Sequence, residues 1–322
     1  MILISTPMQT SLPLPHPYFQ TSTSPPIPYV RIAYFIMIHH KPEVFKEMFK
    51  KIYTKDQFYL IHIDRKAKSE ITEEIQLYLV QFPNVYILES MNIVSGGFGM
   101  IQAELNAIEY LLNVSQEWDY FINLSGEDYP LKSQNIIREF LTNNNGRNYL
   151  FYYDQKFYRP DTLQRIQNHF TELTHKISSF IHKREFMEGI IPYIGGKWII
   201  LTREACLFIT HNKKVRDFKD YYLHTFLPAE SFFQTVLMNT NFNDIIVNDD
   251  KRAIIEKNIF NKDQYIDNLI ESLKSSNQLF IRKINNKTNT HLLKYMRESY
   301  LTPLPKIDEI ERELIRNNFQ NN

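Results

Sequence analysis

The sequence predicts an α/β protein with a mostly parallel central sheet flanked by helices. From residue 30 onward, short runs of β-branched and aromatic residues alternate with amphipathic helical segments, which is the pattern of βαβ units. The chain has 322 residues and a hydrophobic content of 43%, enough to bury a full core in one large domain or two small ones.

Local periodicity places each expected element. The expected strands cover residues 31–38, 58–63, 85–88, 120–124 and 197–201. The expected helices cover residues 42–53, the segment that ends near residue 78, residues 101–112 and the second part of 226–239. Pro42 suits the first turn of the first of these helices. Residues 161–183 are expected to form one long helix.

The two ends of the chain differ from its middle. Residues 1–29 interleave prolines with Ser and Thr, which leaves no helical or strand periodicity, so we expect a disordered tail there. Residues 30–300 are expected to form a single domain. Residues 301–322 are expected to form a polar C-terminal extension with a short helix near 307–315.

Charge and cysteine content narrow the class of protein. The 37 Lys and Arg residues against 36 Asp and Glu residues give a formal net charge of +1, which disfavours a nucleic-acid partner. Cys206 is the single cysteine, so no intramolecular disulfide can form and a reducing compartment is favoured. No apolar run is long enough for a signal-peptide core or a membrane span. We therefore expect a cytoplasmic protein and leave peripheral contact with a membrane open.

The segment after the second expected strand suits a nucleotide. Ligands of parallel sheets bind beyond the carboxyl ends of the strands, and residues 62–66 lie at such an end. Asp64 can accept hydrogen bonds from a ribose or a uracil, and Arg65 can face phosphate. The alternative for Asp64 is a cap on the helix that follows.

Residues 95–99 and 125–130 lie at two further strand ends. The clustered glycines of the first segment let backbone amides approach a ligand closely, or else they form a plain turn. In the second segment, Glu127 and Asp128 suggest that a polar ligand binds there. The alternative is a turn that leads into a helix capped by Ser133.

Glu230 stands between a proline and two phenylalanines at the start of an expected helix. Carboxylates are seldom buried, and apolar surroundings raise the pKa of a carboxyl group toward the range of a general base. The position therefore indicates a catalytic base. The alternative is a charge that interacts with the dipole at the helix N-terminus.

Two basic pairs follow, Lys251 with Arg252 and Arg282 with Lys283. Such pairs are most often solvated surface. However, no Asp-x-Asp triplet occurs in the chain, so the usual carboxylate clamp for a divalent cation on a diphosphate is missing. A sugar-nucleotide enzyme without that metal would neutralise the leaving diphosphate with Lys or Arg.

Six motifs in order resemble glycosyltransferase family 14, which groups core-2/I-branching N-acetylglucosaminyltransferases with peptide O-xylosyltransferases. The resemblance extends from about Arg31 to Arg297. The motifs are HHK (39–41), FYLIHIDRKA (58–67), YFINLSGEDYPLK (120–132), GGKWIILTREA (195–205), PAESFFQTVLMN (228–239) and FIRKI (280–284).

The resemblance implies a GT-A-like catalytic domain over residues 30–300, a UDP-sugar donor, inversion at the anomeric carbon, and neither a metal nor another cofactor. It identifies Glu230 as the catalytic base, Asp64 as a nucleoside contact, and Lys283 and Arg252 as diphosphate contacts. Asp128 and the region of Trp198 would line the cleft. The full set expected to bind the donor is His62, Asp64, Arg65, Asp128, Arg252 and Lys283.

Two departures from the family pattern leave the donor sugar open between xylose and N-acetylglucosamine. Ser95 stands where relatives of the xylosyltransferase type carry Trp, and residues 253–256 replace an aromatic stretch. The acceptor is expected to be a glycan, a glycolipid or a protein. Animal relatives are Golgi membrane proteins, whereas this sequence shows no anchor. The alternative function is a non-catalytic protein that binds sugar nucleotides or glycans on the same scaffold.

Overall fold

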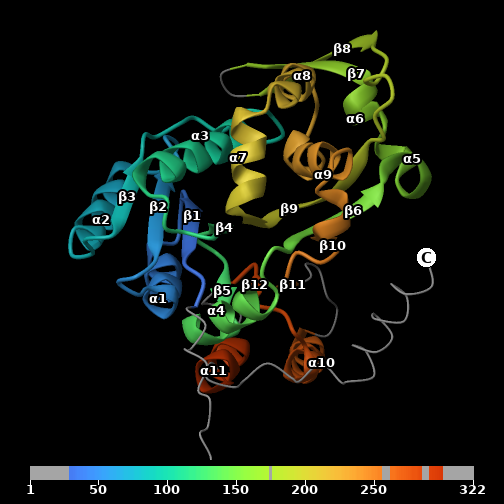
Figure 1. The fold of residues 1–322 in the computed structure, drawn as a ribbon. Coiled ribbons are helices and arrows are strands. Elements are labelled where there is room, and N and C mark those ends of the chain that lie inside the picture. Colours follow the sequence, from blue (N-terminus) through green and yellow to red (C-terminus); the bar gives the residue numbers. More distant parts are fainter. Residues whose placement is uncertain (1–28, 174–175, 256–261, 285–289, 300–322) are drawn as a thin grey trace, which may run out of the picture.

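The computed structural model describes residues 29–173, 176–255, 262–284 and 290–299. Helices cover both faces of a central sheet (Figure 1). The expected N-terminal tail, apart from Tyr29, and the expected C-terminal extension with its helix lie outside the described residues.

The central sheet has seven strands in the order β10-β6-β9-β4-β1-β2-β3. Strands β1, β2, β3 and β4 run parallel, whereas β9 runs antiparallel to both β4 and β6. The bounds are β1 Ile32–Ile38, β2 Phe58–Ile63, β3 Val85–Leu88, β4 Tyr120–Ser125, β6 Asn148–Asp154, β9 Tyr193–Thr202 and β10 Ile246–Val247. The prediction of an α/β fold with a mostly parallel sheet flanked by helices is confirmed, and so are the expected strands.

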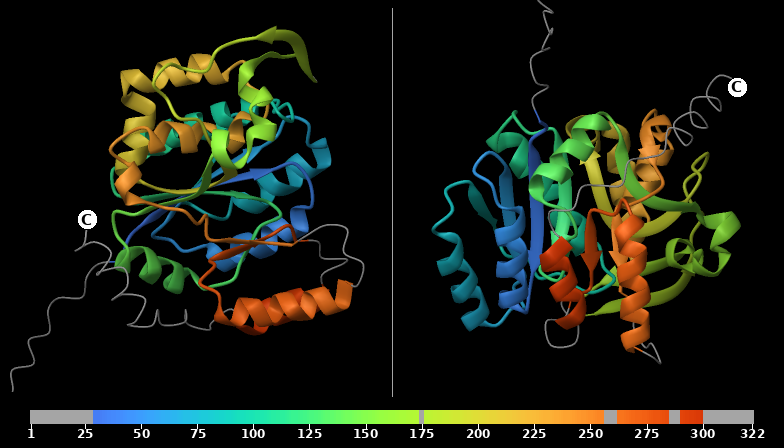
Figure 2. Two further views of the ribbon diagram at one scale, coloured as in Figure 1. Left: turned by 90° about the vertical axis from the view of Figure 1, so that its right-hand side faces the viewer. Right: turned by 90° about the horizontal axis from the view of Figure 1, so that it is seen from below.

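Two hydrophobic cores lie on opposite faces of this sheet, because successive side chains of a strand point to opposite sides. Tyr34 and Ile36 of β1 belong to the first core, and Ala33 and Phe35 belong to the second. The first core is covered by α1 Pro42–Ile52, α2 Ser69–Leu79, α4 Gln134–Asn143, α10 Lys262–Ser275 and α11 Thr290–Ser299 (Figure 2). The second is covered by α3 Gly99–Val114, α7 Arg203–His211, α8 Lys213–Tyr222 and α9 Phe232–Met238. The four expected helices outside residues 161–183 are confirmed.

A small sheet brings distant parts of the chain together. It has the order β11-β12-β5, with β11 Arg252–Ile254, β12 Phe280–Arg282 and β5 Tyr129–Pro130. Ile281 of β12 pairs with Tyr129 of β5, and the amide of Ile284 donates a hydrogen bond of 2.9 Å to the carbonyl of Glu127. The basic pair at 282–283 therefore lies beside the turn that follows β4.

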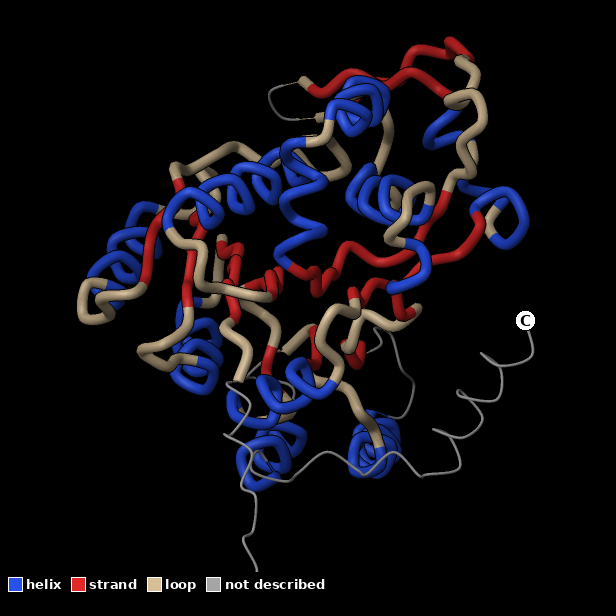
Figure 3. Tube along the Cα trace, in the orientation of Figure 1, coloured by secondary structure: helices blue, strands red, loops and turns tan. Residues whose placement is uncertain are grey.

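The prediction of one long helix over residues 161–183 is wrong. Only short helical turns occur there, and they lead into an antiparallel hairpin of β7 Asn168–Glu172 and β8 Ile177–Lys183 (Figure 3). Tertiary contacts replace the helical ones: the amide of Phe170 donates to the carbonyl of His224 at 3.0 Å, and the ring of Phe170 stacks on Phe226. The remaining short helices are α5 Gln155–Tyr158, η1 Pro160–Thr162, α6 Gln164–Gln167, η2 Pro228–Glu230 and η3 Asn243–Ile245.

The side chain of Asn123 joins β4 to β9 where their backbone pairing stops. The ladder between these strands ends at the pair Ile122 and Ile200. Beyond it, the Asn123 amide donates to the carbonyl of Lys197 and accepts from the amide of Ile199, both at 2.9 Å. One side chain therefore stands in for two main-chain groups at the position where the sheet changes direction.

No helix in the described segments combines the length and the apolar character needed to cross a membrane. Cys206, on α7, is fully buried in the second core.

Candidate active site

The carboxyl ends of β1, β2 and β4 meet at one edge of the sheet. The amide of Asp64 donates to the carbonyl of Ile38, and the amide of Gly126 donates to the carbonyl of Met37, each at 2.9 Å. These bonds hold the turns after the three strands side by side. Two of the segments expected to bind a nucleotide, residues 62–66 and 125–130, therefore lie side by side at the carboxyl ends of parallel strands, where such sheets bind ligands.

The Glu127 cluster is the strongest concentration of charge at this edge. The side chain of Glu127 is only 6% exposed, and its carboxylate pairs with Lys41, with His40 at 3.1 Å and with Lys283 at 2.9 Å. Burial alone would raise the pKa of Glu127, but hydrogen bonds from Lys41 and Lys283 outweigh it and lower that pKa to about 2. Glu127 is therefore a fixed negative charge and cannot act as a proton acceptor near neutral pH.

Asp128 stabilises the turn after β4 from within the protein interior. The residue is fully buried, its Oδ2 accepts hydrogen bonds from the amide and the hydroxyl of Ser125, and its Oδ1 accepts from Arg282 at 3.2 Å. Ser133 then caps α4 by accepting from the amide of Ile136, so the turn-and-cap alternative for this segment is confirmed. Asp128 therefore presents no surface to a ligand, contrary to its expected place in the donor site.

The two expected diphosphate contacts lie in different environments. Lys283 is 42% exposed. Arg252 is only 5% exposed, and its guanidinium donates to the carbonyl of Asn123 at 2.8 Å and to the carbonyl of Asp250. Trp198 is likewise buried, with the guanidinium of Arg252 over its ring at 5.7 Å. Lys283 can reach a ligand, whereas Arg252 ties β11 to β4.

His62, Asp64 and Arg65 follow one another but play different local parts. His62 is fully buried, its Nε2 accepts a hydrogen bond of 3.0 Å from the amide of Met91, and burial lowers its pKa. Asp64 is partly exposed and accepts from the amide of Lys66. The helix α2 begins after Lys68, so Asp64 closes a turn and is not the cap of that helix. Arg65 is exposed and donates to the carbonyl of Ser90. Asp64 and Arg65 can contact a ligand, and His62 shapes the strand end.

Glu230 lies at the end of η2, which is docked on the glycine segment. Leu227, just before Pro228, adopts a left-handed conformation with φ of 52°, and its amide donates to the carbonyl of Gly96 at 2.8 Å. The carboxylate of Glu230 is 39% exposed and pairs with Arg165 at 2.8 Å. The expectation that apolar neighbours bury Glu230 is wrong, because the side chain points away from the two phenylalanines beneath it, which are buried. Its place directly before α9 leaves the helix-dipole alternative open.

The glycines at 97 and 99 permit a close approach by a carboxylate of the β7–β8 hairpin. The amide of Gly99 donates to Glu172 at 3.2 Å, and a Cβ at Gly97 would lie 2.1 Å from the same carboxylate. A side chain at position 97 would displace this carboxylate. The amide of Gly99 therefore faces Glu172, a residue that the sequence had placed in a helix.

Sequence reasoning missed two residues that the structure brings to the site. Arg165 orients Glu230, and its position in an expected long helix concealed this contact. Glu104 is fully buried on α3, where its Oε1 accepts from Asn123 at 2.7 Å and burial raises its pKa to about 8. A signal existed for Glu104, because it is a carboxylate on the apolar face that includes Ile101 and Ile108.

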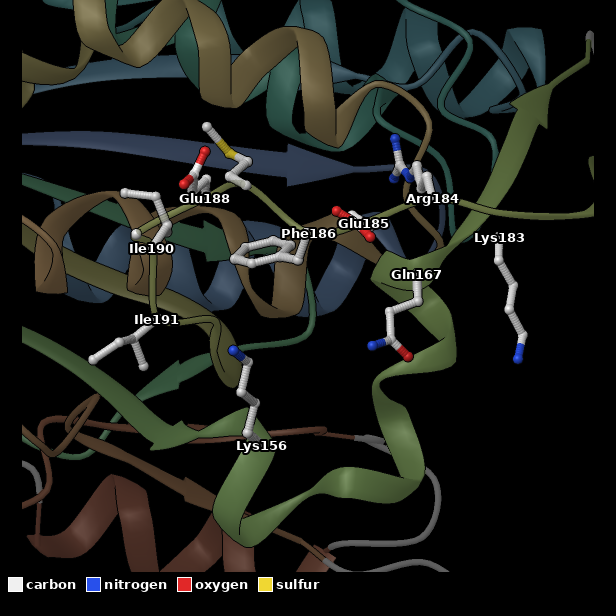
Figure 4. A pocket seen from close by; sticks show the side chains of 11 residues that line it. Lys156, Gln167, Lys183, Arg184, Glu185, Phe186, Glu188, Ile190 and Ile191 are labelled. Atoms are coloured by element: carbon white, nitrogen blue, oxygen red, sulfur yellow. The ribbon is translucent and has the colours of Figure 1, made fainter.

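A separate cavity of about 900 Å³ lies beside this site (Figure 4). It is bordered by α5, the end of α6, the end of β8 and the loop to residue 191, and neither Glu230 nor the Glu127 cluster lines it. Figure 4 shows Phe186 and Ile190 on one side and Lys156 on another. Arg184 at its rim is occupied by the carbonyls of Ile166, Tyr221 and His224. The cavity therefore adjoins the segment that carries Arg165 and is distinct from the strand ends that carry the Glu127 cluster.

Within the described ranges, no group of three or more His, Cys, Asp or Glu residues is arranged to hold a metal ion.

Comparisons with known proteins give a family and several relatives. The family model described as Core-2/I-Branching enzyme matches residues 32–258. A xylosyltransferase of Ciona intestinalis is 30% identical over 240 residues, which are 72% of this chain and 28% of that protein. Xylosyltransferase 1 of Rattus norvegicus is 32% identical over 237 residues, 71% of this chain and 28% of that protein. The chain thus spans less than a third of the length of these relatives.

Among solved structures, mouse xyloside xylosyltransferase 1 in its apo form is 11% identical with a TM-score of 0.37, over 80% of this chain and 99% of that one. A structure of S. aureus TarS, residues 1–349, is 16% identical with a TM-score of 0.27, over 38% of this chain and 35% of that one.

Proposed function

Since this chain belongs to the Core-2/I-branching enzyme family, we propose that it transfers a sugar from a UDP-sugar to an acceptor hydroxyl with inversion of configuration and without a metal ion. The observation that carries the proposal is the Glu230 carboxylate, which is open to solvent and held by Arg165 on the same side of the sheet as α3 and the glycine segment. A base that must meet an incoming hydroxyl needs such an open position.

Glu230 would act on the acceptor. Its free oxygen accepts the proton of the acceptor hydroxyl while that oxygen attacks the anomeric carbon on the face opposite UDP. The bond from the anomeric carbon to the diphosphate oxygen breaks, and its electron pair leaves with UDP. One displacement with one base inverts the configuration. Arg165 touches Glu230 through a single guanidinium nitrogen, so it is a positioning residue that leaves room for the hydroxyl.

Lys283 would act on the leaving group. Its ammonium is 42% exposed and pairs with Glu127, which keeps two further partners in the ammonium of Lys41 and the imidazole of His40. Lys283 can therefore exchange Glu127 for a phosphate oxygen without leaving that carboxylate unpaired. Charge that grows on the diphosphate is then stabilised by a preorganised ammonium, the role that a divalent cation has in other enzymes of sugar nucleotides.

The substrates are proposed from the relatives. The curated relatives named above are xylosyltransferases, which makes UDP-xylose the first donor to test and UDP-N-acetylglucosamine the second. The acceptor is a hydroxyl on a glycan, a glycolipid or a protein. Peripheral contact with a membrane is part of the proposal only for a glycolipid acceptor, and flotation with vesicles tests it.

Release of UDP from a panel of UDP-sugars, with and without acceptors, tests this function. The expected result is UDP release that depends on the donor and is strongly reduced in Glu230→Gln. A non-catalytic binding protein, the second candidate, would bind the same UDP-sugars in calorimetry but release no UDP with any donor and acceptor. That outcome would overturn the enzymatic proposal.

A further inference from the structure

Lys197 is a partly buried ammonium at the sheet edge without an anionic partner among the described residues. It belongs to β9, and its main-chain carbonyl is bound by Asn123 beyond the last β4–β9 pair. Its Nζ has one close polar neighbour, the thioether sulfur of Met100 at 3.8 Å, and lies 4.9 Å from the centre of the Trp198 ring. A thioether is a weak acceptor for an ammonium ion. The side chain therefore lacks the partner that a desolvated cation normally has.

The backbone before Lys197 fixes where this side chain points. A Cβ at Gly195 would lie 1.7 Å from the carbonyl oxygen of Phe151, so β9 and β6 approach each other more closely than any other residue at 195 allows. The register between these strands shifts between Leu150 and Tyr152. Irregularities of this kind redirect side chains next to functional sites.

The charges around Lys197 compensate its ammonium only in part. The groups that act on it are Arg282 of β12, the following Lys283, Glu104 of α3 and Asp128 from the turn after β4. Asp128 is already bound to Arg282. Burial raises the pKa of Glu104 to about 8, which favours the neutral form of this carboxyl group. Burial, followed by the charge of Arg282, lowers the pKa of Lys197. An anion brought to this point would offset both effects.

The donor needs a second cation that Arg252 does not supply. A nucleoside diphosphate carries at least two negative charges, and Lys283 provides one ammonium. The guanidinium of Arg252 is buried and donates to two main-chain carbonyls. Lys197 is an ammonium at the same sheet edge, within electrostatic reach of Lys283, and unoccupied by any described carboxylate.

We propose that Lys197 forms an anion subsite with Lys283 and contacts the diphosphate of the sugar nucleotide. This inference rests on the proposed function and adds to it a residue that holds the leaving group. Glu104 lies behind Lys197 as a positioning residue, since it fixes Asn123, which in turn binds the main chain of Lys197.

Calorimetric titration with UDP, UMP and uridine tests the subsite without requiring turnover. Lys197→Met keeps most of the apolar stem and removes the charge. We expect it to weaken UDP binding by roughly 10- to 100-fold, UMP binding less and uridine binding hardly at all, since a charge-assisted contact to phosphate is lost. Lys197→Arg should retain most of the affinity for UDP. Lys214→Met, at an exposed position on α8, is the matched control and should bind like the wild type.

The outcomes separate this inference from the function on which it rests. If the wild type does not bind UDP, the proposed function fails. If the wild type binds UDP and Lys283→Met weakens that binding while Lys197→Met does not, only the subsite fails.

A structural role for Lys197 as the counter-charge of Glu104 is tested by the double variant Glu104→Gln with Lys197→Met. Recovery of UDP affinity in the double variant would overturn the subsite, and continued loss would support it. The double variant also serves if Lys197→Met alone does not fold. Equal weakening of UDP, UMP and uridine would show a general disturbance of the fold and would likewise overturn the proposal.

Discussion

Glu127 and Glu230 are the same residue type in opposite situations. The side chain of Glu127 is 6% exposed and meets two ammonium groups, Lys41 and Lys283, and the imidazole of His40. Glu230 is 39% exposed and meets one arginine from a one-turn helix. The first carboxylate has a pKa lowered to about 2 by hydrogen bonds that overcome burial, and it is a permanent charge. The second is open to an incoming hydroxyl.

The contrast teaches that two parts of the candidate site, a donor half around Glu127 and an acceptor half around Glu230, are held differently. The half around Glu127 is built on strand ends joined by main-chain hydrogen bonds. The half around Glu230 depends on η2, on main-chain hydrogen bonds from Phe226 to Arg165 and from Leu227 to Gly96, and on the side chain of Arg165. We therefore expect substitutions in the first half to affect donor binding and stability, and substitutions in the second to affect turnover.

The largest expected effect is at Glu230. Glu230→Gln keeps the shape and the contact with Arg165 but cannot accept a proton, so turnover should fall by roughly 10²- to 10⁴-fold while UDP affinity persists. Steady-state kinetics and calorimetry on the same preparation measure both. Glu204→Gln, exposed on α7, is the matched control. Near-normal turnover in Glu230→Gln would contradict the assignment of Glu230 as the catalytic base.

Lys283→Ala should have the next largest effect, on the donor half. Removal of a preorganised ammonium next to the leaving group should cost roughly 3 kcal/mol in kcat/KM and weaken UDP binding as well. Lys214→Ala supplies the comparison at an exposed site. If Lys283→Ala lowered kcat and left UDP affinity unchanged, the division of labour between the two halves would be wrong.

Glu127→Gln tests the fixed charge through stability. Because the pKa of Glu127 is lowered from 4.5 to about 2, its contribution is fully present above pH 4.5 and is lost as pH falls toward 2. The variant should lose about 3 kcal/mol of unfolding free energy at pH 7, and its stability should fall less steeply between these two pH values. Chemical denaturation across this range measures it, with Glu139→Gln on α4 as control. Parallel curves for variant and wild type would contradict the fixed charge.

The smallest expected effect is that of chelation. If Lys283 neutralises the leaving diphosphate, excess EDTA should change the rate by less than about twofold, and manganese should not rescue Lys283→Ala. Loss of activity in EDTA and its recovery with manganese would show that the lysines of the Glu127 cluster do not suffice to neutralise the leaving diphosphate. Glu127 would then become a candidate ligand for the metal ion.

Most of the fold could be predicted because strand and helix periods are local properties. The run at 58–63 is apolar and ends at the observed boundary of β2. The hairpin β7–β8 could not be predicted, because Leu163, Ile166, Phe170 and Leu173 recur at helical spacing. Contacts of residue 170 with segments more than 50 positions away decide the outcome in favour of strands.

The candidate site was predicted in part for the same reason. Motif order identified Glu230, Asp64 and Lys283, which the structure leaves at least partly exposed to solvent. Sequence alone could not separate Lys283 from Arg252, because exposure depends on the small sheet that packs residues 252–254 against β12. Sequence alone also could not identify Arg165 as the partner of Glu230, because Arg165 lies 65 positions earlier in the chain.

The side chain of Asn123, which joins β4 to β9, limits which substitutions this part of the sheet tolerates. The planar amide of Asn123 donates hydrogen bonds to the carbonyl of Lys197 and to Glu104, and it accepts one from the amide of Ile199. Aspartate would lose the donor, leucine would lose both groups, and glutamine would carry the amide one methylene too far. Each of these substitutions therefore breaks at least one of the bonds that join β4 to β9. A search for altered substrate preference should vary the exposed side chains around Glu230 and Lys283 and keep Asn123.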